Sequence, residues 1–178
     1  HQEGQRHCVV GSDNRLGGKL AAERLIAAGA RNLVFLGDSA PIEFAARFAG
    51  AKEIAERTGA TIRVLPTHLE PAQSAEEIAR HFSVVADGFD GVFAATDNLA
   101  IACLQELRRR GIAVPDQVKI VGFDDLPVAA QTQPGLTTVR QDIAAGAKGL
   151  VDLLFRRLGG EDTESLVMPP CLVVRETA

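Results

Sequence analysis

The sequence lacks several features that define particular classes of protein. Its 178 residues include no Trp, no Tyr and a single Met. No apolar stretch approaches the ~20 residues that span a bilayer, so the sequence predicts no membrane-crossing helix. The cysteines, Cys8, Cys103 and Cys171, are odd in number and far apart. That pattern indicates a reducing compartment rather than a framework of disulfides.

An excess of basic residues is also missing. Lys and Arg total 19 against 23 Asp and Glu, which gives a net charge of −4. Domains that grip duplex DNA are normally basic, so we expect no DNA-binding domain in this chain. The sequence opens on His1, its only methionine is Met168, and no signal peptide is visible at its start. These features predict a piece of a longer chain.

Short apolar runs alternate with longer helical patterns along the chain. Hydrophobic residues make up 46% and charged residues 24%, as in globular domains. The strands are expected at 8–10, 32–36, 61–65, 91–95, 118–123, 137–140 and 172–175. The helices are expected at about 14–28, 44–57, 74–86, 97–110 and 143–158. Strands separated by helices form βαβ units, so we predict an α/β fold with a parallel sheet covered on both faces.

The expected helix ends carry capping residues. Asp13 or Asn14 can cap the first helix, and Asp97 can cap the fourth. Ser74, with Glu77 three residues later, has the spacing of a capping box. Gly29, Gly59 and Gly111 follow the first, second and fourth helices, where glycine commonly ends a helix.

Motifs for common enzyme and metal chemistry do not fit. Residues 11–19 (GSDNRLGGK) have the wrong spacing for a phosphate-binding loop and lack its Ser or Thr. Gly17 and Gly18 are instead expected to let this helix pack closely on the sheet. The histidines have no metal-ligand spacing, and no nucleophile motif is present. We expect no catalytic residue, no metal and no cofactor.

Polar residues follow several predicted strands. Ligands of open parallel sheets bind beyond the carboxyl ends of the strands. Carboxylates and hydroxyl groups with few aromatic residues suit a small polyol or a sugar-like ligand, although each residue could simply cap a helix. The polar residues expected at this edge are Asp38, Ser39, His68, Thr96, Asp97, Asp124 and Asp125.

Seven motifs, in order and at the expected spacing, resemble the lactose-repressor (LacI/GalR) family of bacterial transcription regulators. They are 13–18 (DNRLGG), 47–50 (RFAG), 95–100 (ATDNLA), 114–118 (VPDQV), 120–125 (IVGFDD), 134–141 (PGLTTVRQ) and 172–176 (LVVRE). The resemblance implies the C-terminal part of a two-lobed effector domain of the periplasmic-binding-protein-like (type I) fold. The DNA-binding helix-turn-helix and most of the first lobe would then precede His1.

The resemblance also implies how the chain is divided between the lobes. Residues of about 14–133 and 170–178 would form a Rossmann-like second lobe. Residues of about 1–13 and 134–169 would be first-lobe and crossover segments. The helix at 143–158 would then expose an apolar surface that must pack somewhere.

Five effector-binding residues are implied by the resemblance. Arg47 would hydrogen-bond the effector, and Asp124 would hold its hydroxyl or amino groups. Thr96 would face the ligand, and Gln141 would line the cleft from the crossover strand. Leu69 occupies a position where relatives with flat aromatic effectors carry an aromatic residue. The leucine at this position favours a sugar as the effector. Taken alone, Arg47 could be an exposed helix residue, and Asp124 a turn former.

The function that the resemblance implies is effector sensing and dimerisation within a cytoplasmic transcriptional regulator. The effector would be a sugar or a related metabolite. The regulator would be a homodimer or a larger homo-oligomer, and only the segment before His1 would reach operator DNA. One alternative is a periplasmic sugar-binding protein of a transport system, which shares the fold. Another is a Rossmann-type dehydrogenase or a hydrolase, against which the missing GxGxxG and nucleophile motifs argue.

Overall fold

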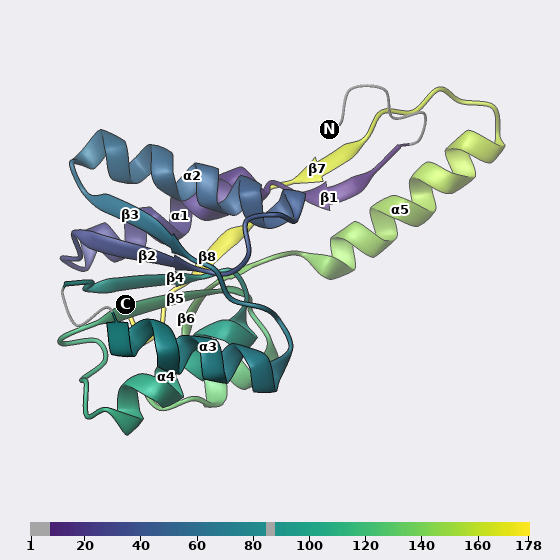
Figure 1. The fold of residues 1–178 in the computed structure, drawn as a ribbon. Helices are drawn as coiled ribbons and strands as arrows, with labels where there is room; N and C mark the ends of the chain where they lie inside the picture. The colour runs from purple at the N-terminus through teal and green to yellow at the C-terminus, as the bar shows by residue number, and fades with distance from the viewer. Residues whose placement is uncertain (1–7, 85–87) are drawn as a thin grey trace.

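A six-stranded sheet with helices on both faces forms the larger part of the chain in the computed structural model, which describes residues 8–84 and 88–178 (Figure 1). The strand order is β3-β2-β4-β5-β6-β8, and only the β6–β8 pairing is antiparallel. Helices α1 and α2 cover one face, and α3 and α4 cover the other (Figure 1). The predicted α/β fold class is confirmed.

The predicted helices and strands occur in the predicted order. The strands are β1 (Val10–Ser12), β2 (Asn32–Leu36), β3 (Thr61–Leu65), β4 (Gly91–Ala94), β5 (Lys119–Asp124), β6 (Thr137–Arg140), β7 (Leu166–Met168) and β8 (Cys171–Val173). The helices are α1 (Asn14–Ala27), α2 (Ile42–Thr58), α3 (Pro71–Val84), α4 (Asp97–Arg109) and α5 (Ile143–Leu158), with a short 3-10 helix at Pro127–Gln131. No helix of the described residues is long and apolar enough to cross a bilayer.

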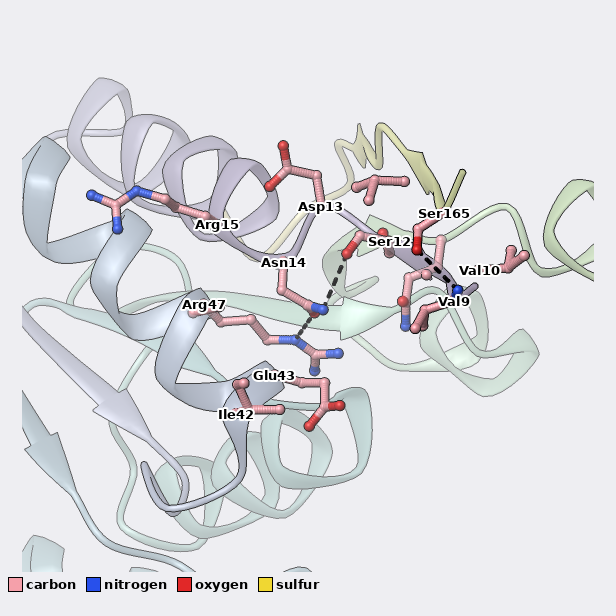
Figure 2. A pocket seen from close by; sticks show the side chains of 14 residues that line it. Val9, Val10, Ser12, Asp13, Asn14, Arg15, Ile42, Glu43, Arg47 and Ser165 are labelled. Carbon is pink, nitrogen blue, oxygen red and sulfur yellow. Dashed lines mark hydrogen bonds between the residues drawn. The ribbon is translucent and has the colours of Figure 1, made fainter. Parts of the chain in front are cut away.

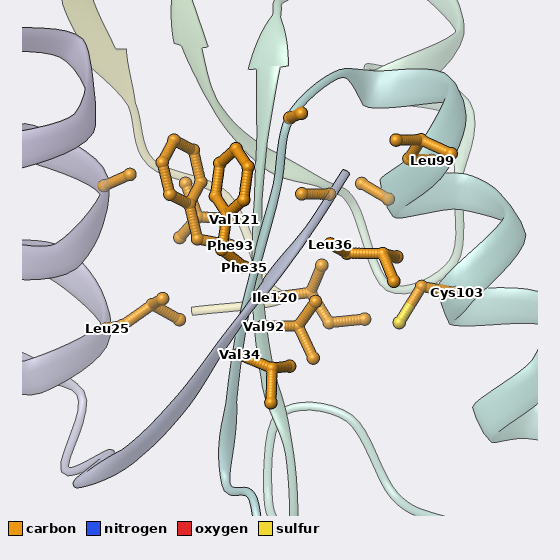
Figure 3. Packing of buried hydrophobic residues seen from close by; sticks show 14 of the residues in the cluster. Leu25, Val34, Phe35, Leu36, Val92, Phe93, Leu99, Cys103, Ile120 and Val121 are labelled. Carbon is orange, nitrogen blue, oxygen red and sulfur yellow. The ribbon is translucent and has the colours of Figure 1, made fainter. Parts of the chain in front are cut away.

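The core lies between the central strands and the helices. Figure 3 shows Leu25 of α1 on one side of the sheet and Leu99 of α4 on the other. Phe35 of β2 and Phe93 of β4 are fully buried and meet edge to face, with 5.3 Å between ring centroids. Because both faces of these parallel strands are covered, their sequences are continuous apolar runs without polar alternation.

The predicted helix ends are partly right. Asp13 caps α1 by accepting a hydrogen bond from the Leu16 N–H, and Gly59 ends α2 in the left-handed conformation. The predicted caps of the two later helices are wrong. Helix α3 begins at Pro71, so Ser74 lies inside it and its hydroxyl donates to the Pro71 carbonyl. The cap of α4 is Thr96 rather than Asp97. The predicted end of α3 at residue 86 lies outside the described residues.

A smaller unit made of β1, β7 and α5 extends away from the large sheet (Figure 1). Strand β7, which the sequence did not predict, pairs in parallel with β1. Strand β6 pairs with β5, so the chain leaves the large sheet after Arg140. The division of the chain into two lobes stays a prediction. Helix α5 buries none of its residues, and Phe155 is 68% exposed.

Candidate functional site

A pocket of about 610 Å³ opens where β1 and β7 approach the N-terminal ends of α1 and α2 (Figure 2). This volume is within the usual range for small-molecule sites. The lining residues come from all four elements and from the segment after β6. They are Val9, Val10, Gly11, Ser12, Asp13, Asn14, Arg15, Ile42, Glu43, Ala46, Arg47, Gln141, Ser165 and Val167.

Two glycines bring α1 and α2 together beneath this pocket. A Cβ on Gly18 would overlap the backbone carbonyl of Arg47, and a Cβ on Gly50 would overlap that of Arg15. Gly17 faces the Phe123 ring of β5, as the sequence predicted. Gly18, in contrast, packs on α2 rather than on the sheet. The close approach sets the distance between the first turn of α1 and Arg47.

Arg47 is the most buried charged side chain of the pocket, with 5% of its surface exposed. Its Nε donates to Asn14 Oδ1 over 2.8 Å, and Nη1 donates to the Ala95 carbonyl. Its guanidinium lies 3.6 Å from the centroid of the Phe123 ring. Asn14 also donates to the Ser12 carbonyl of β1 over 3.2 Å, so the arginine is linked to the smaller unit (Figure 2).

Asp124, at the carboxyl end of β5, interacts both with Arg47 of α2, through its charge, and with Gln141, through a hydrogen bond. Desolvation lowers the pKa of Arg47 to about 10, although the negative charges of Asp124 and Glu43 oppose this shift. Burial raises the pKa of Asp124, against the opposing effects of the Arg47 charge and of a hydrogen bond from Gln141. That bond runs from Gln141 Nε2 to Asp124 Oδ1 over 2.8 Å. The positive charge and the carboxylate therefore share one polar site.

The turn after β5 is held by buried polar contacts. Asp97 is fully buried and accepts hydrogen bonds from the Leu126 N–H over 2.8 Å and from the Thr138 hydroxyl over 2.6 Å. Desolvation raises the pKa of Asp97 to about 6, although these two bonds oppose the shift. The backbone of Asp124 has a φ of 113°, outside the region that most residues adopt. Asp97 therefore helps to hold Asp124 in an unfavourable conformation.

Asp125, the residue that follows β5, accepts hydrogen bonds from two arginines. Its Oδ2 accepts from Arg140 Nε and its Oδ1 from Arg175 Nη2, each over 2.6 Å. Desolvation alone would raise the pKa of Asp125, but the hydrogen bonds from Arg175 and Arg140 outweigh it and lower the pKa. These contacts tie the turn to the end of β6 and to the segment after β8.

The structure brings some of the predicted site residues together. Arg47 and Gln141 line the pocket, and Asp124 contacts both through charge or hydrogen bonding. Thr96 caps α4 with its hydroxyl and is not among the lining residues. Leu69 is 53% exposed and also lies outside the lining. The ligand roles of all five residues stay predictions.

Other polar residues that were expected at this edge of the sheet lie outside the pocket. Asp38, Ser39 and His68 do not line the pocket. Asn14, noted in the sequence only as a possible cap, holds Arg47, and Glu43 had no signal except its position four residues before Arg47. Among the described residues, no group of three His, Cys, Asp or Glu side chains gathers as a metal site.

Comparison with known proteins decides the family. The profile of the periplasmic binding protein-like domain matches residues 22–178. The chain belongs to this family. Within the periplasmic-binding-protein-like family, its relatives are LacI-type transcriptional regulators, so the resemblance to the LacI/GalR effector domain is confirmed.

Three of these similar proteins illustrate the match. The ribose operon repressor of Halalkalibacterium halodurans is 30% identical over 95% of this chain and 52% of its own length. The structure of a complex of the transcriptional regulator CelR with cellobiose has a TM-score of 0.87 at 30% identity, covering 96% of this chain and 54% of that one. A LacI family regulator from Enterococcus faecium with bound ribose has a TM-score of 0.83 at 25% identity, covering 93% and 63%.

This periplasmic-binding-protein-like chain thus spans about half the length of the curated relatives that it matches. Those relatives are named as regulators rather than as enzymes. The same names favour a regulator over the transport-protein alternative.

Proposed function

We propose that this chain is the effector-sensing part of a LacI-type transcriptional regulator and that its pocket binds a sugar-like molecule. The observation that carries the proposal is a buried arginine in a 610 Å³ pocket that Gln141 also lines, with the half-buried carboxylate of Asp124 close enough to act on that arginine. Two similar regulator structures hold cellobiose and ribose, respectively. Their ligands support a sugar as the class of effector here.

The three polar groups suit a polyhydroxylated molecule chemically. The guanidinium of Arg47 is a planar donor, and its Nη2 is not used in the hydrogen bonds to Asn14 and Ala95. The carboxylate of Asp124 accepts hydrogen bonds from hydroxyl groups, and the amide of Gln141 can both donate and accept hydrogen bonds. In this proposal the oxygen of a sugar hydroxyl accepts a hydrogen bond from Arg47, and the hydrogen of a sugar hydroxyl is donated to Asp124.

The pocket is also placed to couple binding to a change of shape. Its lining includes β1 and β7 of the smaller unit and α1 and α2 of the larger one. A ligand that contacts both units favours the relative arrangement in which it makes more contacts. In the proposed regulator, this shift is transmitted to a DNA-binding segment that is not part of this chain.

The wider role follows from the same proposal. A LacI-type regulator works in the cytoplasm, as a homodimer or a larger homo-oligomer, and reaches operator DNA through a helix-turn-helix. One similar protein, GalS of Salmonella typhimurium, is named as an HTH-type regulator. This chain has a net charge of −4, so we assign DNA contact to residues outside it.

A thermal-shift screen of the full-length protein tests this function. The panel contains D-ribose, D-glucose, D-galactose and cellobiose, with ethylene glycol as a control that lacks the sugar ring. We expect at least one sugar to raise the melting temperature and to change the affinity for operator DNA in a gel-shift assay. Stabilisation without any effect on DNA affinity would favour a transport protein. No stabilisation by any sugar would contradict the assigned ligand class.

A further inference from the structure

Glu43 is one of the charged residues that line the pocket, and the motif resemblance does not assign it a role. It lies in the first turn of α2, four residues before Arg47, so both side chains project from one face of the helix. Figure 2 shows its carboxylate beside the guanidinium of Arg47. Glu43 is exposed, and within the described part of the chain it makes no hydrogen bond or salt bridge. Its charge nevertheless acts on Arg47, because it opposes the desolvation that lowers the pKa of that arginine.

The cations of the pocket already have partners. Arg15 donates to Glu53 from Nη2 over 2.8 Å and from Nε over 3.2 Å. Arg47 bonds Asn14 and the Ala95 carbonyl, and Asp124 lies close enough to act on its pKa. The positive charge of the lining is therefore compensated before any ligand enters.

Two helix N-termini point to the same pocket and would ordinarily attract an anion. At α1, the carboxylate of Asp13 occupies this position and accepts from the Leu16 N–H over 2.9 Å. At α2, the cap residue Pro41 makes no side-chain hydrogen bond, and Glu43 supplies the negative charge of the first turn. Both positive helix ends are thus already matched by carboxylates of the chain itself.

We propose that Glu43 sets the charge class of the effector, so that the pocket accepts neutral sugars and rejects their phosphates. A phosphate that approached Arg47 or the start of α2 would face the Glu43 carboxylate, and like charges at short range repel. A neutral sugar meets no such penalty, and its hydroxyl groups can donate to the same carboxylate. This inference rests on the proposed sugar-binding function.

Isothermal titration of the full-length protein with matched sugar pairs tests the inference. The pairs are ribose with ribose 5-phosphate, glucose with glucose 6-phosphate and galactose with galactose 6-phosphate. The wild type is compared with Glu43→Gln, which removes the charge but keeps the shape and the hydrogen-bonding oxygen. The matched control is Glu56→Gln, which makes the same change at an exposed position near the other end of α2, where Glu56 pairs with Lys52 over 3.7 Å.

The ratio of the two dissociation constants within a pair is the quantity that decides. For the sugar that binds, we expect the wild type to bind the phosphorylated form at least about tenfold more weakly than the neutral sugar. In Glu43→Gln, the ratio of the phosphate's dissociation constant to that of the sugar should be about tenfold smaller than in the wild type. Glu56→Gln should leave it unchanged. Equal binding of both members by the wild type, or an unchanged ratio in Glu43→Gln, would overturn the inference and leave the proposed function standing. No binding of any sugar or phosphate by either protein would overturn both.

Discussion

Gln141 donates a hydrogen bond from Nε2 to Asp124 Oδ1 over 2.8 Å, and this bond joins the segment that leaves the large sheet to the end of β5. Gln141 follows the last residue of β6 and stands two residues before α5. The half-buried carboxylate therefore contacts the chain where it passes into the smaller unit. A ligand that binds Asp124 acts directly on this connection.

Gln141→Ala should raise the pKa of Asp124 further. The hydrogen bond from Gln141 favours the ionised carboxylate and so opposes the effect of burial, and its loss leaves the burial effect less opposed. If the ligand binds the ionised carboxylate, its affinity for Gln141→Ala should begin to fall at a higher pH than its affinity for the wild type as the solution is acidified. A carboxyl NMR titration measures the shift, with exposed Gln133→Ala as the control. A lower or unchanged pKa in Gln141→Ala would contradict the assigned contact.

Gly18→Ala should destabilise the fold, because its added Cβ overlaps the Arg47 carbonyl across the α1–α2 contact. Overpacking of this kind costs roughly 1–3 kcal/mol in the free energy of unfolding. Gly11→Ala is the matched control, since a Cβ there meets no atom within 4 Å. Urea denaturation of both variants measures the difference. Equal stability of Gly18→Ala and the wild type would refute the close packing of α1 on α2.

Asp97→Asn should become more stable relative to the wild type as the pH rises. The pKa of Asp97 is about 6 in the folded chain against 3.8 for the free side chain, so the folded state holds its proton more tightly. The stability that this proton provides is fully present below pH 3.8 and is lost as the pH rises through about 6. An upper estimate of the loss is about 3 kcal/mol, from 1.36 kcal/mol for each pKa unit.

Denaturation curves of both proteins between pH 4 and 8 provide the measurement. Asparagine can still accept from the Leu126 N–H, and its amide can donate to the Thr138 hydroxyl, so the variant should keep the turn. A stability difference that does not change with pH would contradict the burial of an ionisable Asp97.

Residues 1–178 alone should self-associate through α5. This helix buries none of its residues, and Leu154, Phe155 and Leu158 are each more than half exposed. Exposed apolar surfaces of this kind favour association. Leu154→Glu combined with Phe155→Glu should shift sedimentation velocity profiles toward the monomer, whereas Val128→Glu, an exposed site on the large unit, should not. A wild-type chain that is monomeric at high concentration would rule this out.

The α/β fold could be predicted because its signals are local. Continuous apolar runs identify buried parallel strands such as β2 and β5, and Gly59 stops a helix through its own left-handed backbone, with a φ of 73°. Asp13 was expected as a cap of α1 and serves as one. These features depend on residues close together in the sequence, so they can be recognised without the tertiary structure.

Features that depend on distant residues could not be predicted. Thr96 and Asp97 are adjacent and both residue types cap helices, but Asp97 turns inward because Thr138, 41 residues later, donates to it. Strand β7 has three residues, and its partner β1 lies near the other end of the chain. The bond between Arg47 and Asn14 depends on the glycine contact between α1 and α2. The sequence named Arg47 through its motif, but the residues that hold it required the structure.

The affinity of Arg47 and Asp124 variants for the sugar found in the screen tests the central claim most directly. Calorimetry on full-length Arg47→Ala and Asp124→Asn should show binding weakened by about ten- to a hundredfold, equivalent to roughly 1.5–3 kcal/mol for a hydrogen bond to a charged group. Arg57→Ala, which removes an exposed arginine of the same helix, should bind like the wild type. Two folded site variants with wild-type affinity would contradict the assignment of this pocket as the effector site.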